Sequence, residues 1–97
     1  MSYFKYNGGS IRSSRDPQNI ASVEYILRKE GETNWRIYLA GVPRLRNFNR
    51  GENLIYNTKG TNNINADNDM TVLAPPEGDG VGGPGYYICT GPDKLNI

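Results

Sequence analysis

The chain has 97 residues, no histidine, one cysteine and a formal net charge of +1. One cysteine excludes an internal disulfide, and without histidine a general base would have to be Asp, Glu or Lys. Hydrophobic residues make up only 36% of the chain, which also contains 12 Gly, 6 Pro and 7 Tyr. This mixture is typical of short strands joined by turns, so we expect one mainly β domain over residues 1–97 that is not an enzyme.

The N-terminal residues predict two short strands. Residues 3–6 form the first and residues 10–14 the second, with Asn7-Gly8-Gly9 between them. Asn-Gly is a strong signal for a two-residue hairpin turn, because both central residues of a type I′ turn have positive φ. We therefore expect these two strands to pair with each other.

Residues 22–40 show the clearest pattern in the chain. Two strand-like segments of alternating residues flank a turn at Gly31, as in a β-hairpin. The predicted core stripes are Val23, Tyr25 and Leu27 on one strand and Trp35, Ile37 and Leu39 on the other. Helical spacing also occurs over residues 18–30, and a helix there is the alternative that the β-branched and aromatic residues disfavour.

The second half of the chain predicts further short strands between long loops. The expected positions are 44–50, 53–56, 70–74 and 86–90. Residues 57–69 form a polar loop rich in Asn and Asp. The strand at 70–74 should end at Pro75-Pro76, because proline lacks the N–H that a strand ladder needs.

Together these elements predict a small antiparallel sandwich or barrel of six to eight short strands with long Gly/Asn-rich loops. Segments 1–15 and 77–85 are candidates for extended contacts with a neighbouring molecule. Cys89 lies within an expected strand and should be a small buried hydrophobe.

Two loops resemble ligand sites but lack the required context. Residues 77–85 are rich in glycine, yet a strand should follow, so no helix N-terminus would face a phosphate. Asn and Asp side chains in residues 62–69 could supply oxygen ligands to Ca²⁺, but neither register has the glycine and acidic residue of an EF-hand loop. We expect no metal and no cofactor, with an irregular Ca²⁺ site at 62–69 as an open alternative.

Charge is distributed unevenly along the chain. Residues 1–60 carry ten basic and five acidic residues, whereas residues 61–97 carry five acidic residues and one lysine. Complementary patches of this kind can join copies head to tail, unless folding interleaves the charges. We therefore expect a homo-oligomer or larger protein assembly. The candidate interface residues are Arg44, Arg46, Arg50, Trp35, Tyr38, Phe48, Asp67, Asp69 and Asp79.

In composition the chain resembles small β-rich virion components, such as capsid decoration, connector or tail proteins of viruses and phages. The sequence shows no signal-peptide pattern and no apolar run long enough for a transmembrane helix. We therefore expect cytoplasmic synthesis, no membrane contact and a structural role in a particle. The alternative is a binding module for glycan or single-stranded nucleic acid, in which Trp35 or Tyr38 stacks on the ligand and Arg44 and Arg46 neutralise phosphate.

Overall fold

A computed structural model describes residues 2–18, 20–40, 48–58, 66–77 and 86–95, with the backbone alone for 74–77. These residues form seven strands and no helix, so none of them belongs to a helix that could cross a membrane. The strands are β1 (Tyr3–Asn7), β2 (Ser10–Ser13), β3 (Ile20–Lys29), β4 (Asn34–Leu39), β5 (Asn53–Asn57), β6 (Asp67–Glu77) and β7 (Tyr86–Thr90).

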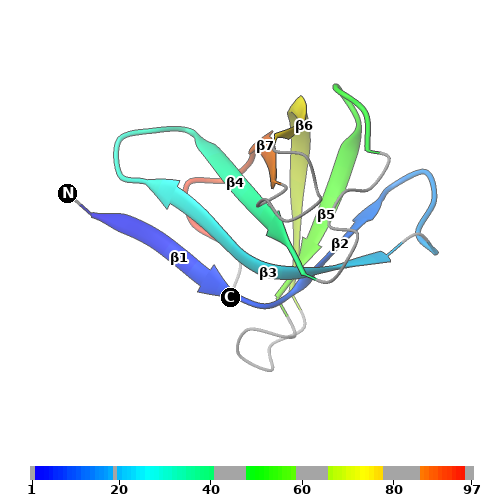
Figure 1. The fold of residues 1–97 in the computed structure, drawn as a ribbon, viewed down its shortest axis with the longest axis horizontal. Coiled ribbons are helices and arrows are strands. Elements are labelled where there is room, and N and C mark those ends of the chain that lie inside the picture. Colours follow the sequence, from blue (N-terminus) through cyan, green and yellow to red (C-terminus); the bar gives the residue numbers. More distant parts are fainter. Residues whose placement is uncertain (1, 19, 41–47, 59–65, 78–85, 96–97) are drawn as a thin grey trace.

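Six of the strands close into an antiparallel barrel (Figure 1). The order around the barrel is β2-β3-β4-β7-β6-β5, and pairing of β5 with β2 closes it. The chain thus builds two three-stranded meanders, β2-β3-β4 and β5-β6-β7, which meet along β4–β7 and β2–β5. Strand β1 lies outside the barrel and pairs with β3. The predicted antiparallel β fold is confirmed, and its form is a barrel.

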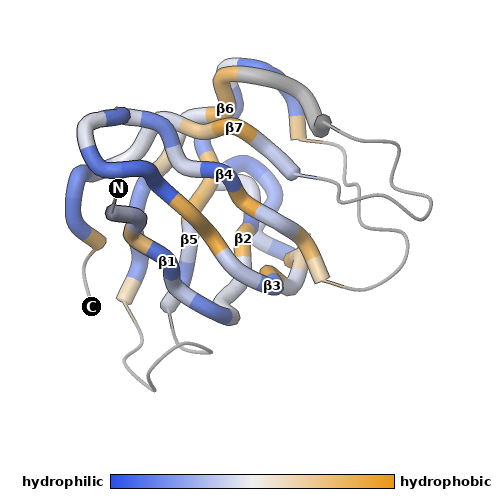
Figure 2. Tube along the Cα trace, turned by 60° about the vertical axis from the view of Figure 1, so that its left-hand side comes forward, coloured by the Kyte–Doolittle hydropathy of each residue, from blue (hydrophilic) through white to orange (hydrophobic). Residues whose placement is uncertain are grey.

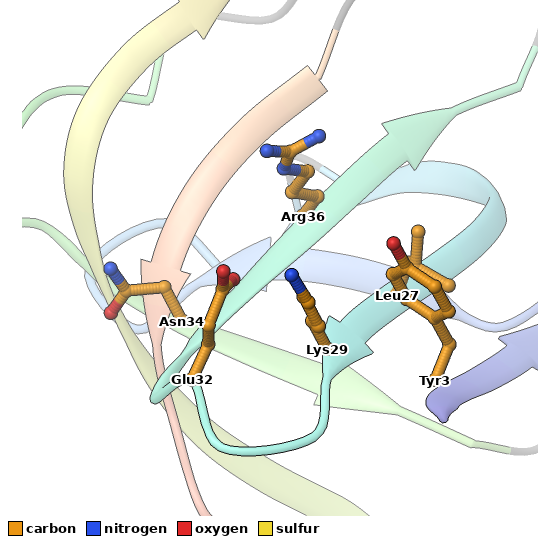
Figure 3. A pocket seen from close by; sticks show the side chains of 6 residues that line it. All are labelled: Tyr3, Leu27, Lys29, Glu32, Asn34 and Arg36. Atoms are coloured by element: carbon orange, nitrogen blue, oxygen red, sulfur yellow. The ribbon is translucent and has the colours of Figure 1, made fainter. Parts of the chain in front are cut away.

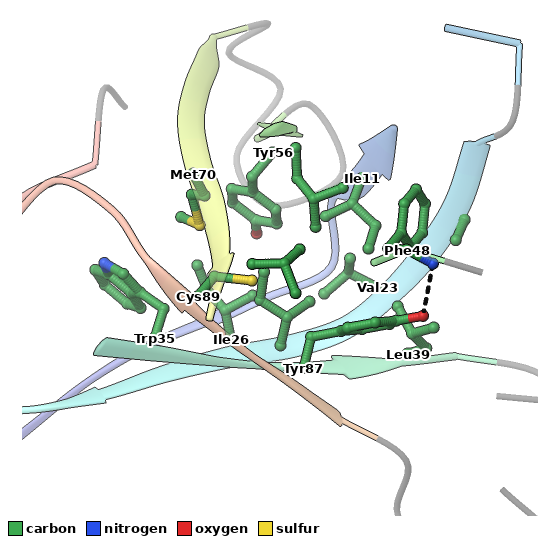
Figure 4. Close-up of a cluster of buried hydrophobic side chains, with 14 of the residues drawn as sticks. Ile11, Val23, Ile26, Trp35, Leu39, Phe48, Tyr56, Met70, Tyr87 and Cys89 are labelled. Atoms are coloured by element: carbon green, nitrogen blue, oxygen red, sulfur yellow. Dashed lines mark hydrogen bonds between the residues drawn. The ribbon is translucent and has the colours of Figure 1, made fainter. Parts of the chain in front are cut away.

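Alternate side chains of each barrel strand point inward and fill the interior (Figure 4). The predicted stripe of Trp35, Ile37 and Leu39 is confirmed, and all three are buried. The other meander contributes Leu54, Tyr56, Met70, Val72, Tyr87 and Cys89. Figure 2 shows the resulting alternation of hydrophobic and hydrophilic positions along the strands.

A bulge in β3 changes which of its residues face the core. The register with β4 shifts between Val23 and Tyr25, so that Val23 and then Ile26 point inward. Tyr25 and Leu27, predicted to continue the core stripe, are instead half-buried on the outer face. The prediction was wrong here because one extra residue in a strand reverses the facing of every residue beyond it. The alternative of a helix over 18–30 is also wrong.

The segment Asn7-Gly8-Gly9 does not form the predicted hairpin. Strands β1 and β2 both pair with β3, Asn7 opposite Tyr25 and Ser10 opposite Ser22. Gly8 and Gly9 have φ values of 83° and 95°. These positive angles make a bend between two strands that follow the same edge of β3, so the strands do not fold back on each other.

Strand β6 is longer at both ends than the sequence indicated. It begins at Asp67, inside the predicted 57–69 loop, and continues through Pro75-Pro76 to Glu77. Its register with β7 shifts between Val72 and Ala74 and again between Ala74 and Glu77. Proline is tolerated where the ladder is interrupted, which explains why the proline pair does not end the strand.

Candidate functional site

The outer surface of β1, β3, β4 and β7 carries a row of tyrosines. Tyr25 lies directly opposite Tyr38, and Tyr38 lies directly opposite Tyr86. The next row along the strands is Lys5, Leu27, Arg36 and Ile88, paired across the same four strands. Tyr3 and Lys29 form a further pair beside it. We call these two rows and this pair the tyrosine–cation face.

The tyrosine rings cover one another's faces. Tyr25 and Tyr38 are stacked, with ring centroids 4.4 Å apart and an interplanar angle of 23°. Tyr38 and Tyr86 are 4.9 Å apart. Lys5 lies 4.6 Å above the Tyr25 ring and Arg36 lies 5.6 Å from Tyr86. The row therefore turns ring edges and hydroxyls outward, since side chains stand roughly perpendicular to a sheet.

The face is positively charged. Lys5, Lys29 and Arg36 belong to it, and none of its strand positions carries an acidic residue. Hydrogen bonding with Tyr38, opposed by slight desolvation, raises the pKa of Arg36 above its usual value. The guanidinium is therefore held in place as a permanent cation beside the tyrosine row.

A small hollow of about 160 Å³ lies on this face, between β1 and the β3–β4 turn (Figure 3). Its lining combines apolar, aromatic and charged side chains. The residues are Tyr3, Leu27, Lys29, Glu32, Asn34 and Arg36. Two cations and one carboxylate surround Leu27 and Tyr3, so the lining of the hollow is mainly polar.

Two residues predicted to bind a partner lie inside the barrel. Trp35 is 0% exposed and its indole N–H donates a hydrogen bond of 2.9 Å to the Pro92 carbonyl. Phe48 is 2% exposed and packs edge-on against Tyr87, whose hydroxyl lies 3.4 Å from the Phe48 amide (Figure 4). Placing Trp35 and Phe48 at an interface was wrong, because both rings complete the core.

The remaining predicted site residues are dispersed. Tyr38 is at the centre of the tyrosine row, whereas Arg50 is exposed beside a different hollow, lined partly by Arg15 and Glu52. Arg44, Arg46 and Asp79 lie outside the described residues, as do most of the 77–85 segment and residues 62–65 of the proposed Ca²⁺ loop.

Two of the acidic candidates, Asp67 and Asp69, lie on β6. Asp67 accepts hydrogen bonds from Arg12 at 3.0 Å and from Asn57 at 2.8 Å, which lower its pKa. Asp69 is exposed and lines a separate hollow that also includes Lys94. Arg12 of the first half of the chain is thus paired with Asp67 of the second half.

Sequence alone missed the contribution of Tyr25, Tyr86, Lys5 and Arg36 to one surface. The signal that was available is the alternation of outward positions in residues 22–40, which already set Arg36 and Tyr38 on one side of their strand. The pairing of β4 with β7 and the bulge in β3, which bring in Tyr86 and Tyr25, could not be foreseen from local patterns.

The single cysteine of the chain is free and buried. Burial raises the pKa of the Cys89 thiol from 9.0 to about 12, so it stays protonated near neutral pH. No group of three or more His, Cys, Asp or Glu side chains is placed to hold a metal ion among these residues. Comparisons with protein-family models, curated proteins and solved structures found no match.

Proposed function

We propose that this chain is a non-enzymatic component of a protein assembly and that the tyrosine–cation face is its principal contact surface. The observation that supports this most strongly is the continuous stack of Lys5, Tyr25, Tyr38, Tyr86 and Arg36. Tyrosine offers a large contact area at low entropic cost, and arginine is similarly enriched at interfaces. The composition further favours a virus or phage particle as the assembly.

A second copy of the chain is the partner we propose for this face. Asp67 and Asp69 occupy the outer surface of β6. That surface lies across the barrel from β3, because β4 and β7 separate the two strands in one direction and β2 and β5 in the other. A contact between opposite faces is heterologous, so it generates rings or open filaments.

The geometry gives less support to glycan or single-stranded nucleic acid as the ligand. Stacking on a base or a sugar requires an exposed ring face. Trp35 is buried, and Tyr38 has its ring between Tyr25 and Tyr86. We therefore favour a protein surface, which can use the ring edges and hydroxyls that the row presents.

Light scattering over a range of protein concentrations tests the proposal. At low salt we expect a molar mass above that of the monomer, and at about 0.5 M salt we expect it to fall, because exposed ion pairs are screened within a few Å. A wild-type protein that is monomeric at every concentration and salt level would contradict the proposed self-assembly.

Matched charge variants identify the surface. Replacing Arg36, an exposed arginine of the tyrosine–cation face, by serine should reduce the molar mass at low salt toward that of the monomer. Arg50→Ser also removes an exposed cation, but from outside the face, and should leave the assembly unchanged. Equal losses of molar mass in the two variants would show that assembly depends on net charge and not on the tyrosine–cation face.

A further inference from the structure

Strand β1 has a second edge that no described strand covers. Among the strands of the structure, β1 pairs with β3 alone. The amide of Glu30 donates to the Ser2 carbonyl at 3.0 Å, and that of Gly8 donates to the Glu24 carbonyl at 2.9 Å. In an antiparallel pair, such bonded positions alternate along the strand. The even-numbered residues of β1 therefore bond to β3, and the N–H and C=O groups of Tyr3 and Lys5 point away from it.

The side chains along this edge leave room for a further strand. Phe4 and Tyr6 pack against the core from the inner side but are only half-buried. On the outer side, Tyr3 is 54% exposed. Natural proteins usually protect an edge with proline, a bulge or charge, and of these β1 carries only the charge of Lys5.

The charge at the edge selects the kind of strand that fits. Lys5 is central in β1, and Lys29 stands beside Tyr3 on the neighbouring strand. Two β1 strands centred on each other would place Lys5 against Lys5, which disfavours a second copy at this position. An acidic side chain opposite Lys5 would instead be attracted.

We infer that the free edge of β1 accepts an extended acidic segment of another protein as an added strand. Its backbone pairs with the outward N–H and C=O groups of Tyr3 and Lys5, as in other cases of β-strand addition. Its acidic side chains lie at alternate positions on the outer side, near Lys5 and Lys29. Its apolar side chains lie on the inner side and cover Phe4 and Tyr6. This contact is additional to the one between copies proposed above.

Two synthetic peptides test the inference in an NMR titration. One is acidic, Thr-Glu-Val-Glu-Val-Glu-Thr, and the other is its basic counterpart with Lys in place of Glu. At a protein concentration where the chain is monomeric, we expect the acidic peptide to shift the amide resonances of Tyr3 and Lys5 and to bind at least ten times more tightly. Equal affinity of the two peptides, or no binding of either at millimolar concentration, would overturn the inference.

Two substitutions at Lys5 separate backbone pairing from charge. Lys5→Pro removes the outward N–H without removing a hydrogen bond to β3, and proline is accepted on edge strands. We expect it to abolish binding. Lys5→Thr keeps the N–H, removes the charge and should weaken binding several-fold. Undiminished binding by folded Lys5→Pro would contradict an added strand.

A modified peptide provides the same test without altering the protein. Methylating the backbone nitrogens of one set of alternate residues blocks the peptide edge that meets β1. Binding should be lost for one set and retained for the other, whereas equal binding of both would contradict strand addition. Because these titrations use monomeric protein and peptide alone, their failure would leave the contact between copies standing.

Discussion

The hydroxyl of Tyr56 on β5 donates a hydrogen bond of 2.8 Å to the carbonyl oxygen of Gly8. This bond fastens the bend between β1 and β2 to the opposite meander. The Tyr56 side chain and the Asn57 backbone also fill the space beside Gly9. A Cβ atom at Gly9 would come within 2.6 Å of the Tyr56 hydroxyl and 2.7 Å of the Asn57 carbonyl. The bend thus depends on glycine both for its positive φ and for close packing.

Substituting Gly9 and Gly31 by alanine distinguishes these two requirements. Both have φ near 90°, but nothing lies within 4 Å of a Cβ atom at Gly31. We expect Gly31→Ala to lower the free energy of unfolding by about 1–2 kcal/mol through backbone strain alone. Gly9→Ala should cost a further 1–3 kcal/mol, roughly, from overpacking. Urea unfolding measures both, and equal losses would show that the contact with Tyr56 does not matter.

At the same bend, the positions of the strands could be predicted from the sequence but their pairing could not. Gly8 has the positive φ that the Asn-Gly pair indicated, but Asn7 belongs to β1 and the second positive φ is at Gly9. The strands on either side were placed almost to the residue. The predicted pairing of these two strands with each other was wrong, because local turn chemistry does not reveal that both strands can pair with β3. Closure into a barrel depends on such pairings between distant segments, so the strands could be predicted but their arrangement could not.

Trp35 is the only tryptophan, and its burial gives a direct optical test. We expect native fluorescence to be blue-shifted, resistant to quenching by acrylamide and insensitive to added sugars. Trp35→Phe removes the hydrogen bond to the Pro92 carbonyl and should lower the free energy of unfolding by about 1–2 kcal/mol. Strong quenching in the folded protein would contradict a core position for this ring.

The raised pKa of Cys89 predicts a loss of stability at high pH. Burial moves the thiol pKa from 9.0 to about 12, so between these values the unfolded chain releases a proton that the folded chain keeps. The free energy of unfolding should therefore fall by about 1.4 kcal/mol per pH unit across this range. Cys89→Ala should lack this contribution, and parallel pH profiles of the two proteins would refute the assignment.

The lowered pKa of Glu52 predicts that the free energy of unfolding falls as the pH is lowered. Its pKa is lowered by hydrogen bonds from the Ser13 hydroxyl and the Asn49 amide and by Arg15, which lies at 3.2 Å. A lowered pKa stabilises the fold above the usual value of 4.5, and this stabilisation disappears as the pH falls below it.

Replacing Glu52 by glutamine measures that contribution. The variant should be less stable at pH 7 by about 1–2 kcal/mol, since hydrogen bonds to a charged group are among the stronger ones. The difference from the wild-type protein should shrink toward pH 2, where the carboxyl group is protonated in both states. A difference that stays constant with pH would mean that the charge of Glu52 does not contribute.

The candidate site was predictable only in part, for a reason visible in single residues. The sequence singled out Tyr38 as a candidate contact residue, but it grouped Tyr38 with Trp35, which faces inward on the same strand, and with Arg50, which lies beside a different hollow. Neighbours in space proved to be Tyr25 and Tyr86, on the adjacent strands. A surface built across strands follows the pairing register, which one strand alone does not determine.

The measurement that most directly tests the proposed assembly is an NMR dilution series of ¹⁵N-labelled protein at low salt. If copies join through opposite faces, the amides of the tyrosine–cation face and those around Asp67 and Asp69 should shift together as the concentration rises. Both sets should return to their monomer positions when salt is added. Concentration-dependent shifts confined to other surfaces, or none at all, would contradict the account.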